Sequence, residues 1–190
     1  METKNIVLVG VGGQGTILAA KLLTIGLMEA GYDVKMSEIH GMSQRGGSVS
    51  SLVRYGDDVQ SPVIEIGTAD IVVAFEKMEA LRALEYLKPT GKIIVNDTEI
   101  YPLSVIIGAN AYPEGILEEI AGKVNMRVMS ATQMAEELGN KKVMNVILLG
   151  SIVKAMGLME IDWGKIIHDN MKKQFIDLNI KALHAGMDAV

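Results

Sequence analysis

The sequence contains no cysteine among its 190 residues. This absence excludes disulfide bonds, thiolate zinc sites and cysteine nucleophiles. It also leaves an iron–sulfur cluster without its usual thiolate ligands in this chain. We therefore expect any electron transfer in which the protein takes part to use redox centres held by another chain.

Positive charge is also scarce, because 18 Lys and Arg residues face 23 Asp and Glu residues and the formal net charge is -5. Binding to nucleic acid without sequence preference depends on Lys and Arg neutralising phosphates, so this composition argues against a nucleic-acid partner. Long apolar runs are missing too. The first run ends at Gly10, and the run at residues 143–153 is interrupted by Asn145, Gly150 and Ser151. These features predict a cytoplasmic protein with no leader peptide and no membrane span.

Hydrophobic residues nevertheless make up 49% of the chain, with 13 methionines but only two phenylalanines and one tryptophan. Methionine adapts to irregular apolar contacts, so its excess suits either a core or a surface that faces a partner. A chain of this length buries about 70% of the surface that its unfolded form exposes. We expect a single domain over residues 1–190, with C-terminal helices from about residue 141 that pack on it or on a partner.

The N-terminal stretch has the strongest pattern. Residues 5–9 form an apolar run, residues 10–15 are rich in glycine, and residues 16–30 repeat apolar positions with a helical period. This order predicts a buried strand, a tight turn and a helix. Glycines at this spacing allow positive φ angles and close backbone approach, and the start of the following helix favours an anion. The candidate site residues here are Gly10, Gly12, Gly13, Gln14 and Gly15.

A second candidate segment follows the next strand, which the alternation of Val34 and Met36 places at residues 32–38. In a dinucleotide-binding fold an acidic group near the end of this strand binds ribose hydroxyls, and Glu38 has that position. Residues 39–47 are polar and rich in glycine. An arginine beside two glycines can bind a phosphate or carboxylate through its guanidinium and the loop N–H groups. The candidate residues are Glu38, His40, Gln44, Arg45, Gly46 and Gly47, although each alone also fits a purely structural role.

The rest of the chain alternates between strand and helix patterns, which predicts an α/β fold. Further strands are predicted at residues 48–55, 69–75, 92–96 and 127–129, with a candidate strand at 103–107. Helices are predicted at residues 77–87, 113–121, 130–139, 141–156 and, as one or two helices, from 162 to the C-terminus. We expect three Rossmann-like layers, with a mostly parallel sheet between helices on both faces. Glu76 and Asn96 fall at strand ends, where strand termination and helix capping explain them better than ligand binding does.

Motifs of a self-sufficient enzyme are missing. No tyrosine is followed by lysine four residues later, no Gly-x-Ser-x-Gly elbow occurs, and no Gly-Lys pair is followed by Ser or Thr. His168 and His184 have no carboxylate or histidine at ligand spacing, so no metal site is predicted. We assign no catalytic residue and expect a binding rim without a reaction centre of its own.

Two motifs together resemble the gamma-type domain of the 2-oxoacid:ferredoxin oxidoreductases. The first is Val-Gly-Val-Gly-Gly-Gln-Gly at residues 9–15, and the second is Glu-Ile-His-Gly-Met-Ser-Gln-Arg-Gly-Gly-Ser-Val at residues 38–49. The His-Gly-Met-Ser-Gln-Arg-Gly-Gly form is similar to that of the indolepyruvate ferredoxin oxidoreductase beta subunits. Relatives acting on pyruvate or 2-oxoglutarate usually carry Gly-Pro-Glu-x-Arg-Gly-Gly instead. The resemblance continues through residues 69–96 and 139–157, and so covers nearly the full chain.

The resemblance implies a hetero-oligomeric enzyme that oxidatively decarboxylates indolepyruvate or another aryl pyruvate. Coenzyme A would be the co-substrate that takes the acyl group, and ferredoxin would receive the electrons. Thiamine diphosphate and the 4Fe-4S clusters would belong to a large partner subunit, so that this chain alone binds no cofactor and is inactive. Arg45 and the loop N–H groups would face an anionic group.

Three other interpretations remain open. The chain could be a gamma subunit for another 2-oxoacid, such as pyruvate or 2-oxoglutarate. It could be a stand-alone NAD-binding Rossmann module or redox sensor that uses Glu38 on the ribose, although the irregular residues 40–47 stand where that fold begins a helix. It could also be an assembly scaffold whose rim touches no ligand.

Overall fold

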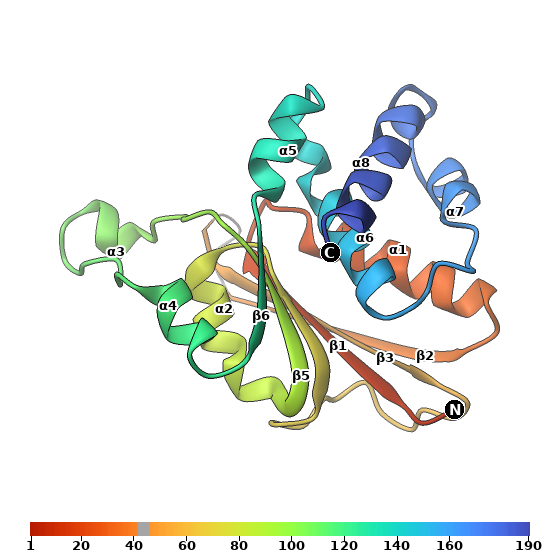
Figure 1. Cartoon of the computed structure of the whole chain (residues 1–190), viewed down its shortest axis with the longest axis horizontal. Helices are drawn as coiled ribbons and strands as arrows, with labels where there is room; N and C mark the ends of the chain where they lie inside the picture. The colour runs from red at the N-terminus through yellow and green to blue at the C-terminus, as the bar shows by residue number, and fades with distance from the viewer. Residues whose placement is uncertain (42–45) are drawn as a thin grey trace.

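The computed structural model describes residues 1–41 and 46–190 of the chain. The strands of this part are β1 (Lys4–Val11), β2 (Asp33–His40), β3 (Ser48–Gly56), β4 (Ala69–Ala74), β5 (Leu87–Asn96) and β6 (Asn125–Met129). They form one sheet in the order β2-β3-β1-β4-β5-β6 (Figure 1). Parallel pairing joins β1 to β4, β4 to β5 and β5 to β6, whereas β3 runs antiparallel to both β1 and β2.

Helices cover both faces of this sheet. They are α1 (Thr16–Glu29), α2 (Lys77–Ala83), α3 (Leu103–Ile106), α4 (Ile116–Ala121), α5 (Ala131–Glu137), α6 (Met144–Ala155), α7 (Trp163–Asn170) and α8 (Ile176–Asp188). Short 3₁₀ turns lie at Leu84–Tyr86, Lys141–Val143 and Lys173–Phe175. Figure 1 shows α1 and α5–α8 on one face and α2 with α4 on the other, while α3 projects from the body. The predicted three-layer fold with a mostly parallel sheet is confirmed.

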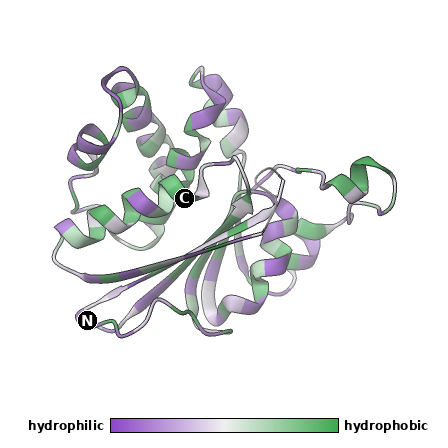
Figure 2. Cartoon of the chain, turned by 180° about the vertical axis from the view of Figure 1, so that it is seen from behind, coloured by the Kyte–Doolittle hydropathy of each residue, from purple (hydrophilic) through white to green (hydrophobic). Residues whose placement is uncertain are grey.

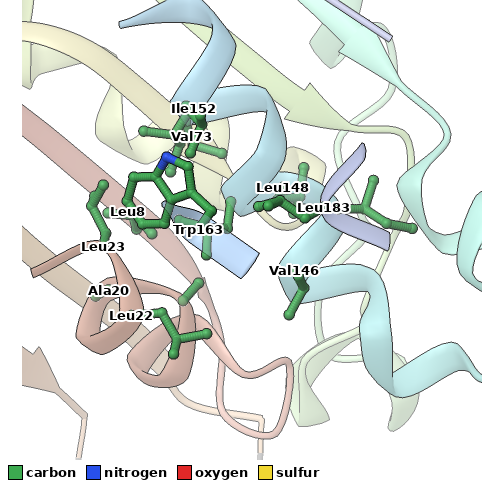
Figure 3. Packing of buried hydrophobic residues seen from close by; sticks show 14 of the residues in the cluster. Leu8, Ala20, Leu22, Leu23, Val73, Val146, Leu148, Ile152, Trp163 and Leu183 are labelled. Carbon is green, nitrogen blue, oxygen red and sulfur yellow. The ribbon is translucent and has the colours of Figure 1, made fainter. Parts of the chain in front are cut away.

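Each face of the sheet has its own core. Because successive side chains of a strand point to opposite faces, β1 contributes Ile6 and Leu8 to one core and Val7 and Val9 to the other. This explains why the strand is apolar at every position of its centre. Figure 3 shows Trp163 of α7 among side chains of β1, α1 and α6 that belong to the larger core.

The C-terminal helices α6 and α8 pack with their backbones in close contact. A Cβ atom added to Gly186 would lie 1.8 Å from the carbonyl oxygen of Ile147, and one added to Gly150 would lie 2.1 Å from that of Leu183. Only glycine allows this approach. The contact positions α6, which in turn packs beside the start of α1.

Several predicted elements differ from the structure, among them the strand predicted at 92–96, which begins already at Leu87. Residues 103–107 are not a strand, because Leu103–Ile106 form the helical turn α3. The helix predicted at 77–87 ends at Ala83, and the chain enters β5 at Leu87. The helix predicted from residue 113 begins only at Ile116, because Gly115 takes a left-handed conformation with φ of 69° just before it.

Nothing in the described part of the chain is a helix both long and apolar enough to cross a bilayer. The same part contains no cluster of three or more His, Cys, Asp or Glu side chains suited to a metal ion.

Candidate functional site

The glycine turn between β1 and α1 lies at the carboxyl end of the central strand. Gly13 and Gly15 have φ angles of 101° and 82°, which glycine adopts without strain. Gly10 needs its missing side chain for another reason, since an added Cβ would lie 2.8 Å from Thr16 Oγ1 and 2.9 Å from Phe75 Cβ. The glycines therefore let the start of α1 sit directly over the ends of β1 and β4.

Gln14 fixes the shape of this turn from within. Its Oε1 accepts a hydrogen bond from the N–H of Val11 at 2.8 Å, and its Nε2 donates to the carbonyl of Phe75 at 2.9 Å. The side chain thus joins the turn to the end of β4. Gln14 was predicted as a rim residue, and the structure gives both of its polar atoms partners inside the protein.

The start of α1 has the features that favour an anion. Gly15 is its N-cap residue, no side chain caps the helix, and no acidic residue lies in the first turn. The first intrahelical bond runs from the N–H of Ala19 to the carbonyl of Gly15, so three N–H groups before it point out of the helix end. Thr16 is buried, and its hydroxyl has no hydrogen-bond partner within residues 1–41 and 46–190. The aligned N–H groups and the helix dipole together favour negative charge, whereas the Thr16 oxygen is closed off from the cleft.

Asn145 of α6 is hydrogen-bonded to the residue that begins this helix. Its Nδ2 donates to the carbonyl of Gly15 at 3.3 Å, and a Cβ on Gly15 would lie 2.6 Å from the same nitrogen. The sequence interpretation noted Asn145 only as an interruption of an apolar run. That interruption was the signal, because a lone carboxamide on an otherwise buried helix needs a polar partner.

The segment after β2 returns to the glycine turn. The N–H of Gly12 donates to the carbonyl of Gly47 at 2.9 Å, and Gly46 has a φ of 79°. His40 is the last residue of β2 and is exposed. Gln44 and Arg45 lie outside the described residues, so their predicted roles remain predictions.

These two segments border an open cleft of about 820 Å³. Of the predicted site residues, Gly12, Gly13, Gly15 and His40 line it. Its other lining residues are Val11, Thr16, Ile17, Leu18, Lys21, Gly41 and Val49. The cleft thus combines apolar walls with the helix start and one lysine. Thr16 and Lys21 were missed by the sequence interpretation, because nothing in an ordinary helical pattern distinguishes them.

Glu38 is not among the residues that line this cleft. It pairs with Ser51 on β3, and Ser51 in turn pairs with Leu8 on β1. In a dinucleotide-binding fold the strand with the ribose-binding acid lies directly beside the first strand. Here β3 lies between them, so the geometry that motivated the ribose role of Glu38 is absent.

Glu76 and Asn96 have structural partners. Glu76 is the N-cap of α2, where its carboxylate accepts from the N–H of Glu79 and from the hydroxyl of Tyr112. Asn96 is fully buried, donates to the carbonyl of Phe75 at 3.0 Å and accepts from the N–H of Thr132 at the start of α5. Burial, followed by the nearby Glu76 charge, raises the pKa of Tyr112. The capping interpretation is correct for Glu76, whereas Asn96 is no N-cap and instead joins the ends of β4 and β5 to the start of α5.

Comparison with known proteins places this fold and cleft in a family. The family described as pyruvate ferredoxin/flavodoxin oxidoreductase matches residues 5–189, and the chain belongs to it. The resemblance to gamma-type subunits of the 2-oxoacid:ferredoxin oxidoreductases is thereby confirmed.

The similar sequences are more particular. The chain is similar to indolepyruvate oxidoreductase subunit IorB of Thermococcus kodakarensis, with 39% identity over 100% of this chain and 96% of that protein. It is also similar to subunit IorB of Archaeoglobus fulgidus, with 41% identity over 96% of this chain and 92% of that protein. Subunit PorC of pyruvate synthase from Methanosarcina barkeri is 26% identical over 84% of this chain and 81% of its own length.

Solved structures share the fold. Pyruvate oxidoreductase subunit PORC of Thermotoga maritima superposes with a TM-score of 0.77 at 23% identity, covering 100% of this chain and 97% of that one. The 2-oxoglutarate:ferredoxin oxidoreductase of Magnetococcus marinus, solved with 2-oxoglutarate, coenzyme A and succinyl-CoA, gives a TM-score of 0.75 at 18% identity. This chain corresponds to 31% of that longer polypeptide.

Proposed function

We propose that this chain is the small, cofactor-free subunit of an indolepyruvate:ferredoxin oxidoreductase, and that its glycine-turn cleft holds an anionic part of coenzyme A. The observation that carries the proposal is the helix start beside the cleft, where three N–H groups precede the first intrahelical hydrogen bond and no side chain caps them. The indolepyruvate specificity rests on the relatives with 39–41% identity that carry that name.

The redox centres would lie in a larger partner subunit. Thiamine diphosphate would supply the nucleophile that attacks the keto carbon, and iron–sulfur clusters would take the electrons on to ferredoxin. This chain has no cysteine, so it offers no thiolate to such a cluster. This composition suits a complex in which the small subunit contributes to binding and the large subunit carries out the redox chemistry.

The residues of the cleft fit coenzyme A in their chemistry. The N–H groups at the start of α1 suit a phosphate oxygen, and Lys21 adds positive charge. Ile17 and Leu18 are 42% and 37% exposed and offer apolar contact beside these donors. Arg45, beside Gly46 and Gly47 in the sequence, is predicted to add a second cation.

NAD fits this arrangement less well. The antiparallel strand β3 separates Glu38 from the glycine turn, so no carboxylate takes the ribose-binding position of a dinucleotide fold. The N–H of Gly12 is also already bonded to Gly47. A stand-alone NAD-binding module is therefore the weaker candidate.

The test is to co-express the chain with its large subunit and to assay the purified pair. We expect reduction of a viologen dye that requires both indolepyruvate and coenzyme A, with kcat/KM at least tenfold above that for pyruvate or 2-oxoglutarate. Each subunit alone should be inactive. A preference for 2-oxoglutarate would contradict the proposed substrate but not the proposed role as a subunit of this family. Binding of NAD to the isolated chain, measured by calorimetry, would contradict the proposal as a whole.

A further inference from the structure

Residues 101–112 form an apolar segment that leaves the body of the protein, and we call it the α3 arm. Leu103, Ile106 and Ile107 are 71%, 68% and 68% exposed, and no residue of α3 is buried. Figure 2 shows the arm as a hydrophobic projection beyond the rest of the molecule. Large apolar side chains gathered in this way mark an interaction site, because monomeric proteins rarely expose them together.

The arm has a defined shape. The N–H groups of Ala109 and Asn110 both donate to the carbonyl of Ser104, at 2.8 and 3.0 Å, and that of Ile106 donates to Pro102 at 3.1 Å. Compact loops whose ends lie close together are frequently functional. The arm therefore presents its apolar side chains in one arrangement before any partner arrives.

Two tyrosines anchor the base of the arm to the body. The rings of Tyr101 and Tyr112 lie 5.1 Å apart between centroids, and the Tyr112 hydroxyl donates to Glu76 at 2.9 Å. Lys77 adds ion pairs to Asp97 at 2.8 Å and Glu99 at 3.1 Å, in the segment that leads from β5 into the arm. An anchored base and an uncovered tip suit insertion into another protein.

We propose that the α3 arm inserts into an apolar groove of the large subunit, which extends the proposed function by naming how the two chains join. No charged residue occurs between Glu99 and Glu114. Transient partners such as electron carriers use charge to find each other, whereas permanent subunit interfaces are more hydrophobic. The uncharged arm fits a permanent partner.

Size and position favour the large subunit over a second copy of this chain. A tip-to-tip contact between two arms would bury only a few side chains, well below the roughly 800 Å² per partner of a stable interface. A groove encloses the arm from several sides. Thr98 and Ile100, just before the arm, line a cavity with Gly13 and Gly15 of the glycine turn. A subunit that binds the arm is thus placed beside the cleft.

The test compares two exposed apolar pairs in the co-expressed complex. The variant Ile106→Ser/Ile107→Ser changes the arm, and Val63→Ser/Ile66→Ser changes residues of similar exposure, 60% and 67%, in the β3–β4 connection, which lies at the amino ends of β1 and β4. We expect the arm variant to weaken the subunit Kd at least tenfold and the control to change it less than twofold. Both variants should keep the wild-type Tm. When the arm variant is added at a concentration that saturates the large subunit, the complex should reach the wild-type kcat.

Each other outcome overturns the proposal in a distinguishable way. If the wild-type subunits assemble and the arm variant binds as tightly, the arm proposal fails and the proposed function stands. If the wild-type subunits do not associate, both fail. If the chain alone is a dimer that the arm variant dissociates, the occupant is a second copy and not the large subunit.

Discussion

Thr16 shows at the scale of one residue how this site is built. Its hydroxyl is buried at the first position of α1, beside Gly10, and has no partner within the described ranges. Leaving a buried hydroxyl unsatisfied costs about 1–3 kcal/mol. The Thr16 oxygen faces Gly10 and is closed off from the cleft, so a ligand there meets the N–H groups of the helix start and the ammonium group of Lys21 instead.

The variant Lys21→Met tests the positive charge of the cleft, because it keeps the length of the side chain and removes the ammonium group. In the assembled complex we expect KM for coenzyme A to rise roughly tenfold with kcat nearly unchanged, since a hydrogen bond to a charged group contributes about 1.5–3 kcal/mol. Steady-state kinetics measure both values. Lys181→Met, at an exposed position of α8, should leave KM unchanged, and an equal rise in both variants would count against the role of Lys21.

Single residues were predictable where the backbone decides their role. Gly13 and Gly15 follow from the local need for positive φ, which the spacing in the sequence expresses. Gln14 was located correctly, but its inward direction depends on the carbonyl of Phe75, 61 residues away. Contacts over such distances are set by the fold and leave no local pattern.

At the scale of elements, helix packing depends on a few small residues. Helices α6 and α8 meet through Gly150 and Gly186, whose added Cβ atoms would collide with backbone oxygens of the facing helix. Backbone cannot move aside as a long side chain can. The position of α6, and of its Asn145 beside the glycine turn, therefore depends on this contact.

The variant Gly186→Ala should separate the two helices. We expect it to lower the free energy of unfolding by roughly 2–3 kcal/mol and Tm by about 5–10 °C, because overpacking forces backbone shifts. Urea unfolding followed by circular dichroism gives both values. Gly164→Ala is the matched control, since its Cβ would meet only Asp162 at 3.4 Å, and its effect should stay below about 1 kcal/mol. Equal losses in the two variants would show that close packing is not the cause.

Elements were predictable where the hydrophobic period was long. The helix at residues 16–29 and the buried strands β1 and β4 follow from it directly. The five-residue run 103–107 was too short to distinguish a strand from a helical turn, and it became α3. The insertion of β3 between β1 and β2 depends on long-range pairing, which no local pattern records.

At the scale of the whole molecule, the free energy of unfolding should decrease as the pH rises through the alkaline range. Tyr55 is 2% exposed, and burial, together with Tyr32 and Asp70, raises its pKa to about 12 from an ordinary value near 10. A group whose pKa is higher in the folded state contributes stability that is complete below the unfolded pKa and is lost as pH rises to the folded one. For Tyr55 that window is pH 10 to 12.

The expected loss for this one group is roughly 2–3 kcal/mol across the window. Urea unfolding at intervals from pH 9 to pH 12 measures it, and Tyr55→Phe should flatten the decline, because phenylalanine has no proton to lose. A decline of the same slope in the variant would assign the effect to other groups.

The role of the whole molecule was predicted by the motifs at residues 9–15 and 38–49, and the family match over residues 5–189 confirms it. The lack of cysteine predicts in addition that redox centres lie in another chain, and that stays a prediction. The partner-facing surface was not predictable in the same way. The methionine excess suggested such a surface, whereas the exposed apolar tip consists of Leu103, Ile106 and Ile107.

The hydrogen bond from Asn145 to Gly15 joins residues 130 positions apart. During synthesis from the N-terminus, the strand and helix around the glycine turn emerge long before α6 exists. The turn therefore acquires its final support only after three quarters of the polypeptide has left the ribosome. Until then the nascent chain contains the residues of the glycine turn without the hydrogen bond from Asn145, so the cleft reaches its final geometry late in synthesis.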